Sequence, residues 1–324
     1  MSGRILITGG AGFLGCSLAK SLSDDNQVVL LDNLHRNSLQ HTQLLNHENI
    51  IFIEGDVRDS GIVSDALKNC TSVIHLASIA GVETVEKSPV ETMQTTLFGT
   101  ENILSACCRI DRIERIVIAS SSEVYGRKAN RVCEADSLIP GQFSSGRFSY
   151  AVSKLAAEFL ALSYHRQYGL PVTVIRPFNV YGPGQVGQGA VRIFISRALS
   201  GLPLEIHNGG SQLRAWCYID DFVDGLLSSL VCEDAVGEVF NLGNPDCVVS
   251  VKELAEMILD QTNSRLPARV IAKAGPDVDV RVPDISKARR MLGFSPGISL
   301  VEGLRRSLDW YRVQAGRLQE GSCG

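Results

Sequence analysis

The sequence predicts an α/β fold with a doubly wound parallel sheet and a smaller C-terminal lobe. Short runs rich in valine, isoleucine and leucine recur up to Pro177, and stretches with helical character separate them. Near-continuous apolar runs are typical of strands that helices cover on both faces, and strand–helix alternation favours parallel pairing. After Pro177 the alternation becomes irregular, and glycine and proline cluster in residues 181–189. This change predicts that the second lobe begins there.

The expected strands and helices follow one another along the first half of the chain. The strands are expected at RILIT (4–8), QVVLLD (27–32), NIIFIEGD (49–56), SVIHLA (72–77), RIVIASS (115–121) and PVTVIRP (171–177). Helices are expected between them, for example in 13–24 and 96–109. We therefore expect residues 1–176 to form the first domain, with part of 217–250 returning to it, and residues 177–324 to form mainly the second lobe.

Composition and charge exclude several classes of protein. The 324 residues carry a net charge of −4 without a long run of one sign, so neither nucleic acid nor an anionic membrane is expected as a partner. No apolar stretch is long enough for a membrane span, and the N-terminus has no signal-peptide pattern, which favours a cytoplasmic protein. The nine cysteines form no Cys-x-x-Cys pair and the six histidines are scattered, so no metal site is expected.

The glycines of TGGAGFLG predict a Rossmann-type dinucleotide site. Gly9, Gly12 and Gly15 follow the first strand directly and open the first helix, together with Phe13 and Leu14. In such a turn the first glycine permits the tight bend, and the second lets the backbone approach a pyrophosphate. The third lets helix and strand pack closely, and the pyrophosphate lies at the helix N-terminus.

Acidic residues after the next two strands favour NAD as the cofactor. Asp32 ends the second expected strand, and Asn33 follows it. An acid at this position binds the ribose hydroxyls of the adenosine and repels the 2′-phosphate of NADP. In GDVRD, after the third strand, Asp56 and Val57 are expected to border the adenine.

A tyrosine and a lysine in SYAVSK predict acid–base chemistry. Tyr150 and Lys154 are four residues apart, so they share one face of a helix. We expect the lysine ammonium to lower the pKa of the phenol, which then accepts a proton from a substrate hydroxyl as hydride leaves for the cofactor. Ser121, at the end of a strand, is expected to hold that hydroxyl in line. An exposed pair on a surface helix is the alternative, which the preceding dinucleotide turn makes less favourable.

The motifs together resemble the extended short-chain dehydrogenase/reductase family. TGGAGFLG, HLAS, SSSEVYG, YAVSK, RPFNVYGPGQ and RAWCYIDD stand in that family's order and cover nearly the whole chain. They are most similar to the branch of nucleotide-sugar 4-epimerases, 4,6-dehydratases and hexuronate decarboxylases. The resemblance implies an NAD-dependent enzyme that oxidises a nucleotide sugar, expected to be a UDP-sugar, transiently at C4. It also implies a homodimer through a four-helix bundle that includes the Tyr150 helix.

The resemblance implies roles for individual residues. It assigns Ser121, Tyr150 and Lys154 to the catalytic triad. Cofactor contacts are implied for Leu76, Ala77, Pro177 and Phe178. Substrate contacts are implied for Asn179 and Arg214 at the diphosphate, and for His207 near the base, where a surface histidine is the alternative. Relatives often carry Arg-Pro-Gly-Asp near the C-terminus, but this chain reads AGPDVDVR, so Arg192, Arg214 and Arg281 are expected to share the phosphate.

Glu123 decides which reaction of this branch is favoured. Similar 4,6-dehydratases carry Asp-Glu where this chain has Ser122-Glu123, and similar 4-epimerases carry a small neutral residue at the glutamate. The hydroxyl-Ser-Glu pattern at 121–123 resembles the hexuronate decarboxylases, and Arg147 also resembles a decarboxylase residue that would meet a carboxylate. We therefore favour decarboxylation of UDP-glucuronate to a UDP-pentose, a lyase reaction. An isomerase that epimerises a UDP-sugar at C4 is second, and a 4,6-dehydratase third.

The charge state of Glu123 bears on that choice. An ionised glutamate would repel a substrate carboxylate, whereas burial raises a carboxyl pKa and would leave the side chain neutral. A glutamate that only orders its loop is the structural alternative. Two further classes stay open, a non-catalytic dinucleotide binder and a simple reductase that releases NADH. The intact set of Ser121, Tyr150 and Lys154 argues against the first of them.

Overall fold

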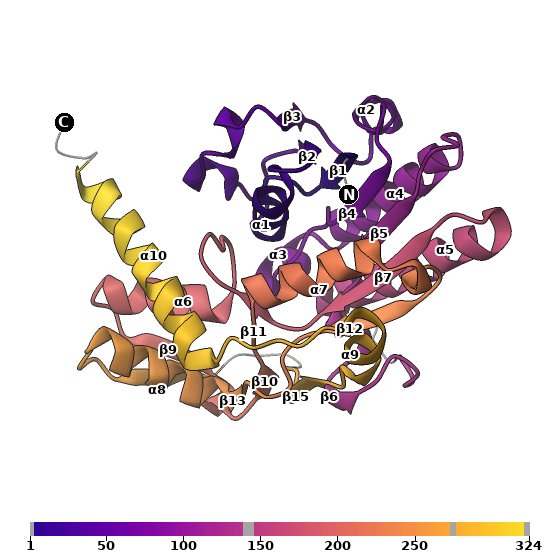
Figure 1. The fold of residues 1–324 in the computed structure, drawn as a ribbon. Helices are drawn as coiled ribbons and strands as arrows, with labels where there is room; N and C mark the ends of the chain where they lie inside the picture. The colour runs from indigo at the N-terminus through magenta and orange to yellow at the C-terminus, as the bar shows by residue number, and fades with distance from the viewer. Residues whose placement is uncertain (1–2, 139–145, 273–276, 321–324) are drawn as a thin grey trace.

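The larger of the two main sheets has seven strands, and every pair in it is parallel (Figure 1). The computed structural model describes residues 3–138, 146–272 and 277–320. The strand order is β12-β7-β5-β4-β1-β2-β3. The bounds are β1 (Arg4–Thr8), β2 (Gln27–Asp32), β3 (Ile50–Glu54), β4 (Ser72–His75), β5 (Arg115–Ala119), β7 (Val172–Pro177) and β12 (Val239–Leu242). The predicted doubly wound α/β fold is confirmed.

The apolar runs form strands because both faces of each strand are buried. In β1, Ile5 and Ile7 face one hydrophobic cluster, whereas Leu6 faces a second cluster on the opposite side of the sheet. In β2, Val28 and Val29 are divided between the two clusters in the same way. A strand with two buried faces has no polar alternation, which is why its sequence reads as a continuous apolar run.

Helices cover both faces of this sheet. Side chains of α1 (Phe13–Leu22) and α7 (Ile219–Val231) share the first cluster. Side chains of α2 (Ser60–Ala66), α4 (Pro89–Cys107) and α5 (Ser149–Tyr168) share the second. A short helix, α3 (Val82–Lys87), precedes α4. The strand order reverses between β1 and β4, and ligands of such sheets bind in the crevice at the carboxyl ends of the strands near this point.

The second lobe contains a four-stranded mixed sheet in the order β13-β10-β15-β6. Its strands are β13 (Val248–Ser250), β10 (Leu213–Ala215), β15 (Val280–Pro283) and β6 (Lys128–Val132). β6 is contributed by the first half of the chain, between β5 and α5, and pairs in parallel with β15. No strand was predicted at residues 128–132. The pairing carries the chain that follows SSSEVYG into the second lobe.

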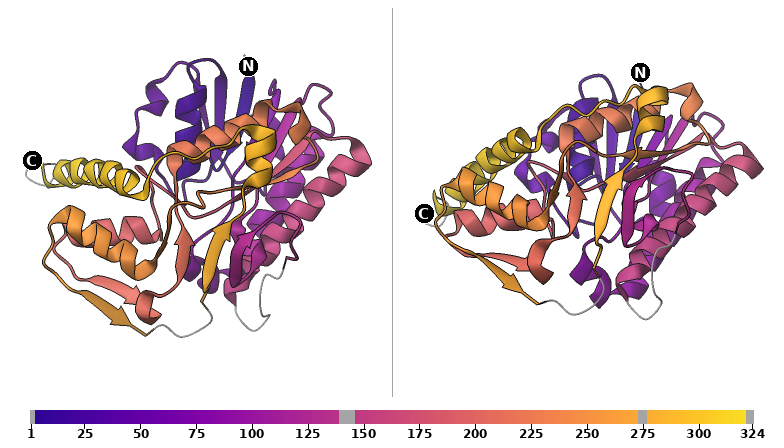
Figure 2. Two further views of the ribbon diagram at one scale, coloured as in Figure 1. Left: turned by 60° about the horizontal axis from the view of Figure 1, so that its bottom comes forward. Right: turned by 90° about the horizontal axis from the view of Figure 1, so that it is seen from below.

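The rest of the lobe surrounds that sheet. The short strand pairs are β8 (Val180–Tyr181) with β11 (Cys217–Tyr218), and β9 (Leu204–His207) with β14 (Ala268–Ile271). The helices are α6 (Ala190–Leu199), α8 (Val251–Thr262), α9 (Ser286–Leu292) and α10 (Leu300–Glu320). Figure 2 shows α6, α8 and the pair β9/β14 at the end of the lobe away from α5. Among the helices of the described residues, none has the length and apolar character needed to cross a bilayer.

Short 3₁₀ turns complete the described chain. They are η1 (Leu39–His41), η2 (Leu44–Asn46), η3 (Ser122–Tyr125), η4 (Gly146–Phe148), η5 (Asn208–Gly210) and η6 (Glu233–Ala235). The turn η3 lies between β5 and β6, so it connects the parallel sheet to the second lobe.

Candidate functional site

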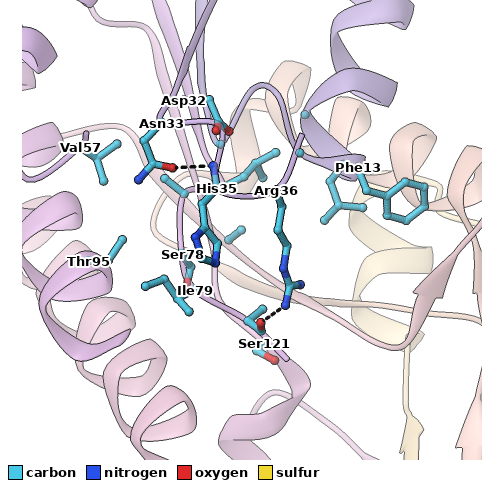
Figure 3. A pocket seen from close by; sticks show the side chains of 18 of the residues that line it. Phe13, Asp32, Asn33, His35, Arg36, Val57, Ser78, Ile79, Thr95 and Ser121 are labelled. Carbon is cyan, nitrogen blue, oxygen red and sulfur yellow. Dashed lines mark hydrogen bonds between the residues drawn. The ribbon is translucent and has the colours of Figure 1, made fainter. Parts of the chain in front are cut away.

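A cavity of about 450 Å³ opens at the carboxyl ends of the parallel strands (Figure 3). Fourteen residues that the sequence assigned to the cofactor line it: Gly9, Gly12, Phe13, Leu14, Gly15, Asp32, Asn33, Asp56, Val57, Leu76, Ala77, Tyr150, Lys154 and Pro177. Phe178 is fully buried outside the cavity lining, where its ring lies 6.0 Å from that of Tyr125. The cofactor contact assigned to its side chain therefore stays a prediction without geometric support.

The glycine turn has the geometry that a pyrophosphate requires. Gly9 has a φ of 69°, a left-handed conformation that glycine adopts without strain. A Cβ on Gly15 would lie 2.7 Å from the Cα of Gly10, so only glycine lets α1 start this close to the turn. Gly12 caps α1 without a side-chain hydrogen bond, which leaves N–H groups of the first turn for a ligand.

Asp32 and Asp56, the two acids predicted to border the adenosine, both line the cavity and are held in place by hydrogen bonds. Asp32 accepts hydrogen bonds from the backbone N–H groups of Ala11 at 3.1 Å and Leu34 at 2.7 Å. Burial raises its pKa, and these hydrogen bonds oppose the shift. Each oxygen keeps a further lone pair, which suits a ribose diol. Asp56 accepts from the Arg58 guanidinium at 2.6 Å, and this interaction lowers the pKa of Asp56.

The three residues of the expected triad meet at the inner end of the cavity. Ser121, Tyr150 and Lys154 all line it. The Lys154 ammonium donates to the backbone oxygen of Ala119 at 2.6 Å and lies 6.0 Å from the centre of the Tyr150 ring. Ser121 lies close enough to Tyr150 to lower the pKa of its phenol. The i, i+4 spacing therefore places both side chains of α5 beside the end of β5.

The pKa of Tyr150 departs from the prediction. Burial raises it to about 12, and the charge of Glu123 adds to the shift. The groups that lower it are the Ser121 hydroxyl, Arg36 and Arg281. The expectation of a lowered phenol pKa was therefore wrong. Burial also lowers the pKa of Lys154 to about 8, because a buried ammonium loses hydration.

Arg36 is a cavity residue that the sequence analysis missed. Its guanidinium donates a hydrogen bond to the backbone oxygen of Ala80 and extends toward Ser121 (Figure 3). A Cβ on Gly81 would lie 2.6 Å from one of its nitrogens, and a Cβ on Gly187 would lie 2.8 Å from its central carbon. Two glycines therefore make room for this cation. The local sequence holds no signal for it, since the glycines come from distant segments.

A cluster of charged residues lies next to Tyr150 and centres on Glu123. Glu123 belongs to η3 and forms an ion pair with Arg281 of β15, whose side chain is only 3% exposed. Burial raises the pKa of Glu123, but the charge and hydrogen bond of Arg281, with the charges of Arg147 and Arg214, outweigh burial and lower it overall. The idea that burial leaves Glu123 neutral was therefore wrong.

Asp277 is the second acid of this cluster. Its carboxylate accepts from the Arg147 guanidinium at 3.3 Å and from the Gln212 amide at 2.8 Å, and it lies 3.9 Å from the Arg214 guanidinium. Arg214 and Arg281 are directly paired across β10 and β15. We call Glu123, Asp277, Arg147, Arg214 and Arg281 the arginine cluster. Its three guanidinium groups exceed its two carboxylates by one positive charge.

The other predicted substrate residues are distributed around both parts of the site. Ser122 is buried in η3 beside Glu123. Asn179 lines the cavity, and its amide donates to the backbone oxygen of Ala215 at 2.9 Å. The backbone oxygen of His207 accepts from Gln212, the residue that also binds Asp277. Arg192 lies apart from the arginine cluster, on α6, where it donates to the backbone oxygen of Gly187 at 2.8 Å.

This chain is similar to known proteins over nearly its whole length. Residues 5–243 match the model of the NAD dependent epimerase/dehydratase family. The UDP-N-acetyl-alpha-D-glucosaminuronate decarboxylase of Bacillus cytotoxicus is 34% identical over 322 residues, which cover 96% of this chain and 98% of that protein. UDP-glucuronic acid decarboxylase 3 of Arabidopsis thaliana is 35% identical over 325 residues, with coverages of 96% and 90%. The solved UDP-glucuronic acid 4-epimerase of Bacillus cereus, in complex with UDP-glucuronic acid and NAD, has a TM-score of 0.88 at 29% identity, with coverages of 96% and 99%.

Proposed function

This chain belongs to the NAD dependent epimerase/dehydratase family, as its motifs predicted, and on that premise we propose that it decarboxylates UDP-glucuronate to a UDP-pentose. The observation that carries the proposal is the arginine cluster beside Tyr150, with its one positive charge in excess. A hexuronate differs from a hexose by one carboxylate, which is the charge that such a cluster accommodates. The decarboxylases among its relatives support the same choice.

The cofactor that we propose is NAD. The fit of the glycine turn to a pyrophosphate and the position of Asp32 support this choice over NADP. Residues 1–176, with part of 217–250, would hold the cofactor, and residues 177–324 would bind mainly the nucleotide sugar. When bound, NAD supplies the acceptor for hydride from C4 of the sugar and returns that hydride at the end of the cycle.

The residues of the triad would handle the proton at C4. Tyr150 takes the proton of the C4 hydroxyl, and Ser121 donates a hydrogen bond to the oxygen that becomes the ketone. The 4-ketone makes the C6 carboxylate part of a β-keto acid. The C5–C6 bond then breaks, CO₂ leaves, and the bonding electron pair moves onto the C4 oxygen as an enolate. Tyr150 and Ser121 stabilise this oxygen by hydrogen bonding, and C5 takes up a proton from solvent. As the hydride returns to C4, Tyr150 gives its proton back to the C4 oxygen.

Glu123 fits this reaction because Arg281 balances its charge. An ionised glutamate alone would repel a second carboxylate, but Arg281 balances that charge. Arg147 and Arg214 together face the single carboxylate of Asp277, so the cluster keeps one positive charge in excess for the substrate. The Asp277 carboxylate lies 3.3 Å from the Arg147 guanidinium and 3.9 Å from that of Arg214, so both groups already face one carboxylate. A preorganised arginine pair of this kind favours a planar anionic group.

A 4-epimerase is the second candidate. The triad suffices for that reaction, and the similarity to the Bacillus cereus 4-epimerase favours it. A 4,6-dehydratase is third, because Ser122 stands where that reaction needs an acid for the leaving hydroxyl.

Product analysis separates these candidates. The purified protein is incubated with UDP-glucuronate, UDP-N-acetylglucosaminuronate, UDP-glucose and UDP-N-acetylglucosamine, and products are followed by NMR and CO₂ release. The proposal predicts CO₂ and a UDP-pentose from UDP-glucuronate. UDP-galacturonate or UDP-galactose without CO₂ would establish the epimerase instead. Bound NAD in the purified protein is expected, because the hydride is recycled; an empty protein that accumulates free NADH would contradict recycling.

We further propose that two copies associate through α4 and α5, which lie side by side (Figure 1). Phe98 on α4 is 55% exposed and Phe159 on α5 is 61% exposed, and large apolar side chains on adjacent helices favour a partner surface. The expected mass in solution is twice the 35.1 kDa of one chain. Phe159→Glu should give the single-chain mass, whereas Val301→Glu, an equally exposed apolar position on α10, should leave the dimer intact. A wild-type protein of single-chain mass at micromolar concentration would refute the dimer.

A further inference from the structure

Tyr125, the tyrosine of SSSEVYG, belongs to a buried network of hydrogen bonds outside the cavity. Tyr125 ends η3, two residues after Glu123, and its side chain points into the protein, where it is 6% exposed. Its hydroxyl accepts a hydrogen bond from Arg176 at 2.6 Å and donates one to the amide oxygen of Asn241 at 2.9 Å. Arginine only donates, so the direction of both hydrogen bonds is fixed.

The network continues to the helix that carries Tyr150 and Lys154. Arg176, on β7, binds both oxygens of Glu158 on α5 at 2.9 and 2.7 Å, and both side chains are nearly fully buried. Glu158 follows Lys154 by one helical turn, and its charge counters the effect of burial on the pKa of that lysine. One guanidinium therefore links α5 to the η3 turn.

The network is fully satisfied at its other end. The side-chain amide of Asn241, on β12, donates to the backbone oxygen of Val132 at 2.9 Å, and its backbone N–H donates to Glu134 at 2.7 Å. Since each donor in the network has a defined acceptor, the Tyr125 hydroxyl is held in a single hydrogen-bonding arrangement. A buried ion pair adds little net stability compared with apolar side chains of similar size. Stability alone therefore does not explain why Arg176 and Glu158 are paired here.

We propose that Tyr125, held between Arg176 and Asn241, is a positioning residue that fixes the η3 turn, with Ser121 and Glu123, against the α5 helix that carries Tyr150 and Lys154. The proposal rests on the proposed roles of those four residues. It predicts that the hydroxyl of Tyr125 acts on the rate of the chemical step, although it lies outside the cavity. Substrate affinity should hardly change, since the ion pair between Glu123 and Arg281 is kept when only the Tyr125 hydroxyl is removed.

Tyr125→Phe tests the proposal, because it removes one oxygen and keeps the buried ring. We expect kcat to fall about tenfold with KM within twofold of wild type, since a displaced catalytic group loses rate rather than binding. Tyr164→Phe is the matched control. It also removes a tyrosine hydroxyl bound to a glutamate, Glu101, at 2.7 Å, but on a part of α5 remote from the cavity. This control should keep wild-type kcat.

A second measurement does not depend on turnover. Hydrogen–deuterium exchange of residues 120–127 reports the turn directly, because the Val124 and Gly126 amides are hydrogen-bonded within it. Tyr125→Phe should speed exchange there, and Tyr164→Phe should not. Unchanged kcat together with unchanged exchange in Tyr125→Phe would overturn the proposal, whatever happens to Tm. A wild-type protein inactive on every nucleotide sugar would refute the proposed function instead. The exchange measurement would still show whether Tyr125 fixes the η3 turn.

Discussion

Replacing Tyr150 by phenylalanine is expected to lower turnover by about 10³-fold, which lies within the usual range for loss of a general base. The phenol is the group positioned to take the C4 proton, since Tyr150 lines the cavity together with Ser121 and Lys154. The ring remains in Tyr150→Phe, so the shape of the cavity is kept. Product formation by NMR gives kcat, and the amount of NAD that copurifies should equal that of wild type.

The control for this prediction is Tyr168→Phe on the same helix. Tyr168 is 59% exposed, and its hydroxyl accepts a hydrogen bond only from the neighbouring Gln167 among the interactions of the described residues. It should keep wild-type turnover. If Tyr150→Phe retained more than a tenth of the activity, Tyr150 would not be the base.

The pH dependence of wild type follows from the same two residues. Tyr150 has a pKa of about 12, so the rate should rise as pH increases toward neutrality and a larger fraction of the phenol is ionised. Lys154 has a pKa of about 8, so its positive charge, which supports the phenolate, is lost above that value. The rate should therefore rise with pH up to about 8 and level off above it, because the loss of the Lys154 charge offsets the further gain in phenolate.

The residues that line the cavity could be predicted from the sequence because their signals are local. A strand, three spaced glycines and a helix lie within the first 22 residues, and Asp32 ends the adjacent strand. The positions of Tyr150 and Lys154 also follow from a spacing within one helix. Each of these features depends on a few neighbouring residues, and sheet topology then places them at one edge.

The charge environment of Glu123 could not be predicted, because it depends on residues far away in sequence. The sequence indicated burial, but Arg281, 158 residues later, reverses the shift in pKa. That contact exists because β6 leaves the first half of the chain and pairs with β15. Asp277 and Arg36 were missed for the same reason, since their partners lie in other segments and no local spacing relates them.

The arginine cluster makes Glu123→Gln the substitution that most sharply separates decarboxylation from the earlier oxidation step. Removal of the glutamate charge leaves three guanidinium groups against the single carboxylate of Asp277. The larger positive charge should bind a hexuronate more tightly, but it stabilises the carboxylate that must become neutral CO₂. We therefore expect KM for UDP-glucuronate to fall several-fold and the rate of CO₂ release to fall roughly 30-fold. This magnitude is what one extra positive charge, partly screened by solvent, would add to the stabilisation of the substrate carboxylate.

The oxidation at C4 should survive in Glu123→Gln, since the Glu123 charge raises the pKa of Tyr150 and its loss makes the phenol easier to ionise. The 4-keto sugar or its C4 epimer should therefore accumulate while CO₂ release slows, and NMR distinguishes these products from the UDP-pentose. The double variant Glu123→Gln/Arg281→Gln is the matched control, because it restores an excess of one positive charge and should return KM toward wild type. Equal rates of CO₂ release in wild type and Glu123→Gln would mean that the glutamate only orders the η3 turn, and the cluster would then have to act through its arginines alone.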